Sequence, residues 1–481
     1  MQRNIILFEL NEVPFRILEH YARFRPESAL ARLMREAKLH ETYAEDVGHL
    51  SPWRTWPTLH RGVLDDAHTI EDFGQDLSEV DKEFPPLWQV LAKNGVSVGI
   101  CGTLHSYPPP ADLENYEFYL PDTFASGSEC FPKKLSAFQE MNLSMARSSA
   151  KNVSRGLPWR EALNFLKAMP DLGIRMETNA SVGRQLLGER FAPWKSTRRR
   201  VFQSVMAFDI YYKHLRTTRP AFSSFFTNHV ASAMHSYCAA SFPCDYDEIE
   251  LSEDWLRTFG NEIDFALDKA DAMIARLVEF VDRNPDYALW IASSMGQEAT
   301  QAKLLKTQVF IADKDKFLGV LGIESGQWEE RPAMFPQFNL QVNESAVGTL
   351  ETALRGLSID NEFIRFRLKD GGFFSIDLGH ENLHDREFEL TLNGETKTMQ
   401  DLGLDFFEPS EQVSVTAYHI PQGTLLTYDS AAAGSNGQRT QISTLDVAPS
   451  ILSNFGIKPL DHMKGSESLT EAPKPVFQAA A

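Results

Sequence analysis

The sequence predicts an α/β protein. We expect a three-layer α/β/α core around a mostly parallel sheet, carrying one helical insertion and one antiparallel β insertion. Three observations lead to this prediction. Buried-strand and helical patterns alternate in the N-terminal third, which is the rhythm of βαβ units. Residues 130–220 are helical in pattern and mixed in charge. Between residues 301 and 412, short alternating strands and turn signals such as Asn393-Gly394 indicate antiparallel pairing.

The core elements follow in order along the chain. Each expected strand is short and apolar, and each expected helix carries an apolar face, so that sheet and helices bury each other. Expected strands are Asn4–Leu10, Val96–Cys101, Phe222–Phe226, Tyr287–Ala292 and Thr424–Thr427, and expected helices are Phe15–Ala37, Leu87–Asn94, Glu262–Arg283 and Val447–Phe455. Val413–His419 is a further expected strand of the core.

These elements divide the chain into six segments. The core α/β domain comprises 1–129, 221–300 and 413–465, the helical insertion 130–220, the antiparallel β insertion 301–412, and a disordered tail 466–481.

Composition limits the classes of function. The net charge of −19 disfavours nucleic-acid binding, which requires a basic surface. No apolar run approaches the ~18 residues that span a bilayer, so no membrane span is expected. The N-terminus has no cleavable leader pattern, and a cytoplasmic location is therefore expected.

A framed hydroxyl residue is the most informative local feature. In the run Ser51-Pro52-Trp53-Arg54-Thr55-Trp56-Pro57-Thr58, Thr55 lies between Trp and Pro residues at the predicted start of a helix. Free N–H groups and the helix dipole favour anionic oxygens at such a place. The alternative reading of the run is a buried turn with a capping threonine.

The order of four blocks resembles the alkaline phosphatase superfamily, closest to its type I phosphodiesterase/nucleotide pyrophosphatase branch. The blocks are Asn4–Phe15, Ser51–Gly62, Leu87–Cys101 and Tyr418–Gly465. The resemblance implies an alkaline-phosphatase-like core, and a Thr or Ser nucleophile assisted by two metal ions. By position, Thr55 matches the nucleophile, and His235 and His419 match two metal ligands.

Several expected ligands differ from the family pattern. Asn11 stands for the first-strand aspartate, and Asn228 for a second aspartate. Ser294 and Met295 replace an aspartate and a histidine, and neither side chain suits zinc. We therefore expect one weakly held divalent ion, zinc or manganese, on His235, His419 and Asn228, or no metal.

Other residues near these positions complete the predicted site. Arg54, Asn11, His105 and Asn228 are the expected substrate contacts, and Thr55, His235 and His419 the expected catalytic residues. Strand alternation places Glu9 on the same side as Asn11, which makes Glu9 a better replacement than Glu12 for the lost carboxylate.

The resemblance implies a hydrolase or transferase that acts on a phosphate, phosphonate or sulfate ester through a threonine. Two alternatives stay open: a metal-independent group-transfer enzyme with a histidine-activated threonine, and a non-catalytic binding protein. The expected partner is a small molecule or a glycan precursor. The sequence leaves the oligomeric state open, a homo-oligomer included.

Overall fold

An eight-stranded sheet forms the centre of the computed structural model, which describes residues 2–150, 159–333, 336–369, 371–409, 413–431, 438–467 and 469. Within this sheet β19 is antiparallel to both its neighbours, and the other paired strands are parallel. In sheet order the strands are β20 (Arg439–Ser443), β2 (Lys38–Tyr43), β19 (Leu425–Tyr428), β6 (Tyr287–Ala292), β1 (Asn4–Leu10), β5 (Phe222–Thr227), β3 (Val98–Cys101) and β4 (Phe118–Leu120). The predicted mostly parallel α/β core is confirmed.

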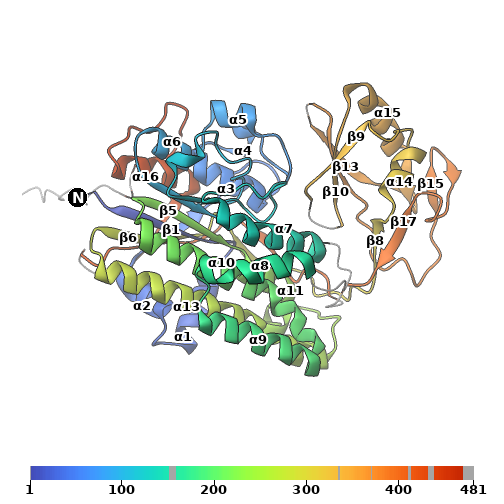
Figure 1. The fold of residues 1–481 in the computed structure, drawn as a ribbon. Coiled ribbons are helices and arrows are strands. Elements are labelled where there is room, and N and C mark those ends of the chain that lie inside the picture. Colours follow the sequence, from blue (N-terminus) through green and yellow to red (C-terminus); the bar gives the residue numbers. More distant parts are fainter. Residues whose placement is uncertain are drawn as a thin grey trace, which may run out of the picture.

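Helices cover both faces of this sheet (Figure 1). Side chains alternate along β1, so that Ile6 and Phe8 face one layer, and Ile5 and Leu7 the other. The first layer contains α1 (Phe15–Phe24), α2 (Ala29–Glu36), α10 (Arg199–Thr218), α11 (His229–Ser241) and α13 (Glu262–Arg283). The second contains α3 (Pro52–Arg61), α6 (Leu87–Lys93) and α16 (Val447–Asn454). Burial on both faces explains why these strands are apolar throughout.

One helix of the predicted helical stretch 130–220 belongs to the core. Its described helices are α7 (Ser136–Ala150), α8 (Trp159–Leu172), α9 (Met176–Phe191) and α10. Phe208 and Tyr211 of α10 belong to the main hydrophobic core, where both rings contact Phe225 of β5. Helix α10 is therefore part of the layer that covers the sheet.

A second lobe with its own hydrophobic core lies beside the sheet domain (Figure 1). Its four-stranded sheets are antiparallel, in the orders β13-β14-β10-β9 and β12-β11-β15-β16, and β8 pairs with β17. The elements are β8 (Gln308–Ile311), α14 (Lys314–Val320), β9 (Trp328–Arg331), β10 (Phe338–Val342), α15 (Glu344–Arg355), β11 (Leu357–Ile359), β12 (Glu362–Phe363), β13 (Arg365–Lys369), β14 (Phe373–Asp377), β15 (Leu390–Leu392), β16 (Glu395–Thr396) and β17 (Leu404–Phe407). The predicted antiparallel β insertion is confirmed.

Local boundaries differ from the prediction in three places. The expected helix Phe15–Ala37 is broken at Pro26, and Ser28 begins the second half by accepting a hydrogen bond from the backbone N–H of Ala31 at 3.1 Å. Strand β2 directly follows this helix and has no counterpart in the prediction. The expected core strand Val413–His419 is shortened to β18 (Ala417–Ile420), which pairs with β7 (Gly296–Ala299) outside the main sheet.

Three shorter helices, α4 (Asp65–His68), α5 (Ser78–Glu83) and α12 (Glu253–Phe259), complete the sheet domain. Among the described residues, no helix combines the length and the apolar character that crossing a bilayer requires. Most of the tail predicted for 466–481 lies outside the described residues.

Candidate functional site

Three potential metal ligands converge at the carboxyl end of the central sheet. The Oε2 atom of Glu12 lies 2.9 Å from Nε2 of His235 and 3.3 Å from Nε2 of His419. Among the described residues, this cluster is the one group of three His, Cys, Asp or Glu ligand atoms that lie within 4.8 Å of one another. We call Glu12, His235 and His419 the ligand cluster.

Each member of the ligand cluster comes from a different element. Glu12 follows β1 in a turn, with a left-handed φ of 57°. His235 lies on α11, which follows the neighbouring strand β5, and His419 lies on β18. Because β1 and β5 are adjacent and parallel, the residues that follow them meet at the same edge of the sheet.

Backbone carbonyls fix both imidazoles in one orientation. Nδ1 of His235 donates to the carbonyl of Ala417 at 2.7 Å, and Nδ1 of His419 donates to the carbonyl of Leu50 at 2.8 Å. Both Nε2 atoms are thereby directed toward Glu12. This arrangement is typical of metal-binding histidines, whose second ring nitrogen is held by a hydrogen bond that sets the tautomer.

Glu12 is buried and held by amides. Asn11 Nδ2 donates to Glu12 Oε1 at 2.7 Å, and Gln297 donates to Oε2. Burial raises the pKa of Glu12, but the charges and hydrogen bonds of His235 and His419 outweigh it and hold the pKa well below its usual range. Burial alone would lower the pKa of His235, but Glu12 raises it above the ordinary value. The cluster therefore contains a carboxylate at neutral pH.

The donor set fits a divalent ion. Two imidazole nitrogens and one carboxylate oxygen are the ligands of many zinc sites that keep a position open for water or substrate, and manganese accepts the same atoms. Among the described residues, no backbone carbonyl accepts a hydrogen bond from either Nε2 atom, so a bound ion would displace none. The fit rests on orientation as well as on residue type.

The two asparagines predicted at the site form a chain of hydrogen bonds next to Glu12. Asn11 Nδ2 donates to Asn228 Oδ1 at 2.7 Å, and Trp56 Nε1 donates to Asn11 Oδ1 at 2.7 Å. Asn11 and Asn228 both line the cleft described below. The amide oxygen of Asn228 accepts from Asn11, and its role as a metal ligand stays a prediction.

Thr55 is not among the residues that line the cleft. Its side chain is fully buried, and Oγ1 is 2.8 Å from Oγ of Ser294. Met295 next to it is also fully buried. Ser51, one helical turn earlier, is the hydroxyl residue of this run that lines the cleft, and it caps α3 by accepting from the N–H of Trp53 at 3.3 Å.

Arg54 and His105 have different surroundings from those expected. Arg54 lines the cleft, but its guanidinium already pairs with Asp65 at 2.8 Å and Glu71 at 2.7 Å. His105 lies behind Trp53 and donates from Nε2 to the carbonyl of Trp53 at 3.0 Å. Burial lowers its pKa to about 3, so the imidazole is neutral at physiological pH. The lining of the cleft does not include His105.

The expectation that Glu9 replaces the lost carboxylate is wrong. Glu9 points into the core, where Oε1 is 2.7 Å from Nε2 of His60. The turn at Glu12 ends the strand alternation on which that expectation depended. The signal for Glu12 was available in the sequence, because an acidic residue just after a buried parallel strand lies at the edge where such sheets bind ligands.

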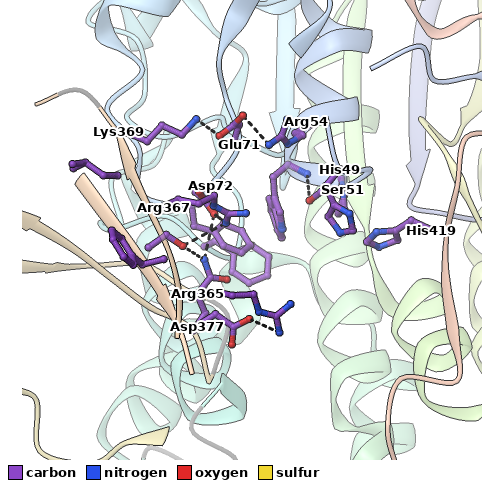
Figure 2. A pocket seen from close by; sticks show the side chains of 18 of the residues that line it. His49, Ser51, Arg54, Glu71, Asp72, Arg365, Arg367, Lys369, Asp377 and His419 are labelled. Atoms are coloured by element: carbon purple, nitrogen blue, oxygen red, sulfur yellow. Dashed lines mark hydrogen bonds and ion pairs between the residues drawn. The ribbon is translucent and has the colours of Figure 1, made fainter. Parts of the chain in front are cut away.

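A large cleft opens from the ligand cluster toward the second lobe. Its volume is about 1960 Å³, and its lining includes all three members of the cluster. Figure 2 shows His49, Ser51, Arg54 and His419 on the wall that belongs to the sheet domain. Residues of β13 and β14, among them Arg365, Arg367, Lys369 and Asp377, form the opposite wall.

Comparisons with known proteins give similarity in structure only. No family model and no curated protein matches the chain. Solved structures that match include an inactive form of murine ectonucleotide pyrophosphatase/phosphodiesterase 5 in complex with AMP, with 11% identity, a TM-score of 0.42, and coverage of 97% of this chain and 98% of that chain. The human protein of the same name matches with 9% identity, a TM-score of 0.39, and coverage of 96% and 97%. Ps i-CgsB in complex with k-i-k-neocarrahexaose matches with 9% identity, a TM-score of 0.40, and coverage of 97% and 75%. At these values no match assigns a residue or a reaction to this chain.

Proposed function

We propose that this protein is a hydrolase or transferase that cleaves a phosphate, phosphonate or sulfate ester, with one divalent ion, zinc or manganese, held by Glu12, His235 and His419. The observation that carries the proposal is the orientation of the ligand cluster, in which two imidazoles held at Nδ1 direct Nε2 toward one carboxylate oxygen. The ester class is supported by the sequence blocks that resemble the alkaline phosphatase superfamily.

A bound divalent ion supplies Lewis-acid polarisation of an ester oxygen. The chain itself contributes orientation and charge. Asn11 and Gln297 fix the carboxylate of Glu12, and the carbonyls of Leu50 and Ala417 fix the imidazoles. The N-terminus of α3 lies beside the cluster, where its N–H groups and dipole favour an anionic oxygen.

Two hydroxyls compete for the role of nucleophile or substrate contact. Thr55 has the position that the resemblance implies, but its side chain is fully buried against Ser294 and would have to become accessible before it could react. Ser51 faces the cleft already. Thr55→Val and Ser51→Ala each remove one hydroxyl and serve as controls for one another. Loss of turnover in one variant alone identifies the hydroxyl on which the reaction depends.

Metal content tests the proposal directly. We expect the purified protein to contain about one zinc or manganese ion per chain by elemental mass spectrometry, or to bind one on titration. Glu12→Gln keeps the size of the side chain and removes the charge. It should weaken metal binding by more than the 10–100-fold that follows loss of a supporting hydrogen bond, and should abolish turnover of chromogenic phosphate and sulfate esters.

Glu298→Gln is the matched control, because Glu298 is an exposed glutamate on β7 beside Gln297. Its metal content should equal that of the wild type. A metal-free wild type that turns over esters would favour the metal-independent transferase instead. If the protein neither binds metal nor turns over an ester, the remaining alternative is a non-catalytic binding protein.

A further inference from the structure

The wall of the cleft that the second lobe provides carries a row of cations. Arg365, Arg367 and Lys369 alternate along β13 and therefore lie on one face of the strand. All three line the cleft, and Figure 2 shows them opposite His49 and His419. Strand β13 is the edge of its sheet, so this row borders the open space of the cleft.

This row and the ligand cluster border the same cleft. Its lining includes Glu12, His235 and His419 together with Arg365 and Arg367.

The three cations differ in how far their charge is already matched. Arg367 pairs with Asp72, and Lys369 pairs with Glu71, so these two hold the lobes together. The Arg365 side chain is 77% exposed, and its ion pair with Asp377 is long, at 3.7 Å, which is beyond hydrogen-bond range. The Arg365 guanidinium is therefore well placed to bind an anionic group by donating two parallel hydrogen bonds to it.

An aromatic group lies in the cleft as well. The rings of Phe73 and Phe124 are 4.1 Å apart between centroids, and Trp53 is 5.0 Å from Phe124. All three line the cleft, and Trp53 and Phe124 are partly exposed there. Partly exposed aromatic rings beside hydrogen-bonding groups suit a sugar ring, whose apolar face packs on aromatic carbon while its hydroxyls remain hydrated.

Size and charge restrict the ligand further. The volume of about 1960 Å³ exceeds the ~300–1,000 Å³ of sites for drug-sized molecules, which favours an extended substrate. The whole chain carries a net charge of −19, which disfavours a nucleic acid. The lining of the cleft, by contrast, contains six Arg or Lys residues and six Asp or Glu residues. The formal charges of the lining therefore balance, and the excess negative charge of the chain lies elsewhere.

We propose that the substrate is an anionic oligosaccharide. Its reacting ester lies at the ligand cluster, a sugar ring packs on Trp53 and Phe124, and a second acidic group of the same chain binds Arg365. This inference rests on the proposed function for the identity of the reacting end. The contact with Arg365 is independent of the metal, because Arg365 belongs to the other lobe.

Binding to metal-free protein therefore tests the substrate class separately from the reaction. We would titrate the chelator-treated full chain with hexasaccharides of three kinds, sulfated, uronic-acid and neutral, at low salt in a calorimeter. We expect one of the anionic kinds to bind and the neutral one to bind weakly or not at all. Arg365→Ala should weaken anionic binding by about five- to tenfold, and Arg365→Lys should restore part of it. Added salt should weaken wild-type binding more than binding by Arg365→Ala.

Arg386→Ala is the matched control, because Arg386 is a half-exposed arginine of the same lobe outside the lining of the cleft. Its affinity should equal that of the wild type. Absence of binding to every anionic hexasaccharide would overturn the inference. Equal affinity of Arg365→Ala and wild type would overturn it as well, and is the result expected if the charges of β13 serve only to prevent edge-to-edge strand pairing. Tighter binding of a hexanucleotide would assign the cleft to nucleic acid. The tests of metal binding and of ester turnover do not depend on the result of these titrations.

Discussion

At the residue scale, Glu12 shows how one backbone angle creates a site. A glutamate with a left-handed φ of 57° is uncommon, and the conformation costs on the order of 1 kcal/mol. The turn directs the carboxylate toward His235 and His419 and away from the core that its neighbour Glu9 enters. An extended backbone at this position would have placed the side chain elsewhere. This conformational cost falls on the residue whose side chain must meet the histidines of α11 and β18.

Asp122 provides a test of buried charge that is independent of the ligand cluster. Burial raises its pKa to about 6, against an ordinary value of 3.8. Between these values the folded state holds a proton that the unfolded state has lost, so the contribution of Asp122 to stability declines as the pH rises through about 6. In Asp122→Asn the amide oxygen can still accept from the N–H of Phe124, which donates to Oδ1 at 2.8 Å.

We expect Asp122→Asn to gain stability over wild type as the pH rises from about 4 to 7, up to roughly 2–3 kcal/mol. Urea unfolding at several pH values measures the difference. The exposed Asp66→Asn is the control for loss of a charge. A difference that is constant across the pH range would contradict the raised pKa.

At the element scale, α3 is organised around a proline. Pro57 has no N–H to donate to the carbonyl of Trp53 one turn earlier. His105 supplies the missing donor from a neighbouring loop at 3.0 Å. The histidine expected to contact substrate therefore completes the helix that carries Ser51, Trp53 and Thr55.

His105→Leu should destabilise the protein by about 1–2 kcal/mol, because the partly buried carbonyl of Trp53 loses its partner. His105→Gln keeps an N–H donor and should lose less. Denaturant unfolding compares the two variants. Equal stability of the two variants would mean that packing, and not the hydrogen bond, is the contribution of His105.

The accuracy of the sequence prediction depended on the kind of signal. Apolar strands and helices buried on both faces of the sheet were predicted within a few residues, since hydrophobic period alone specifies them. Strand β2 was missed because its sequence, KLHETY, alternates weakly and its identity as a strand depends on β19 and β20. His235 and His419 could be placed by resemblance. The β13 row could not, because its position across the cleft depends on the tertiary structure. Glu12 was missed because strand alternation was extended past the end of β1, where the backbone turns.

At the scale of the whole molecule, the segment 71–73 holds the two lobes together. Asp72 pairs with Arg367 and accepts from Gln337 at 3.3 Å, and the carbonyl of Phe73 accepts from Asn339 at 3.1 Å. Glu71 pairs with Arg54 on one side and Lys369 on the other. The width of the cleft is therefore set by contacts at one end of it.

Asp72→Ala should loosen this connection without unfolding either lobe, because each lobe has its own hydrophobic core. We expect faster hydrogen exchange in the 69–77 segment and in β13, and a larger radius of gyration by solution scattering. Glu330→Ala is the control, since Glu330 pairs with Lys314 within the second lobe. Unchanged exchange and dimensions in Asp72→Ala would show that the remaining contacts suffice.

The two connections of the second lobe run side by side. Leu304 and Val413 form an antiparallel bridge, and β7 and β18 pair just before the chain leaves the sheet domain and just after it returns. Cutting the chain at this neck would leave two ends about one strand spacing apart, near 5 Å, which a short turn can join. Because both of its connections pass through this neck, the lobe is one continuous insert that can be removed or exchanged as a unit. Glu12, His235 and His419 all lie outside that insert, so a chain carrying a different lobe would keep the ligand cluster.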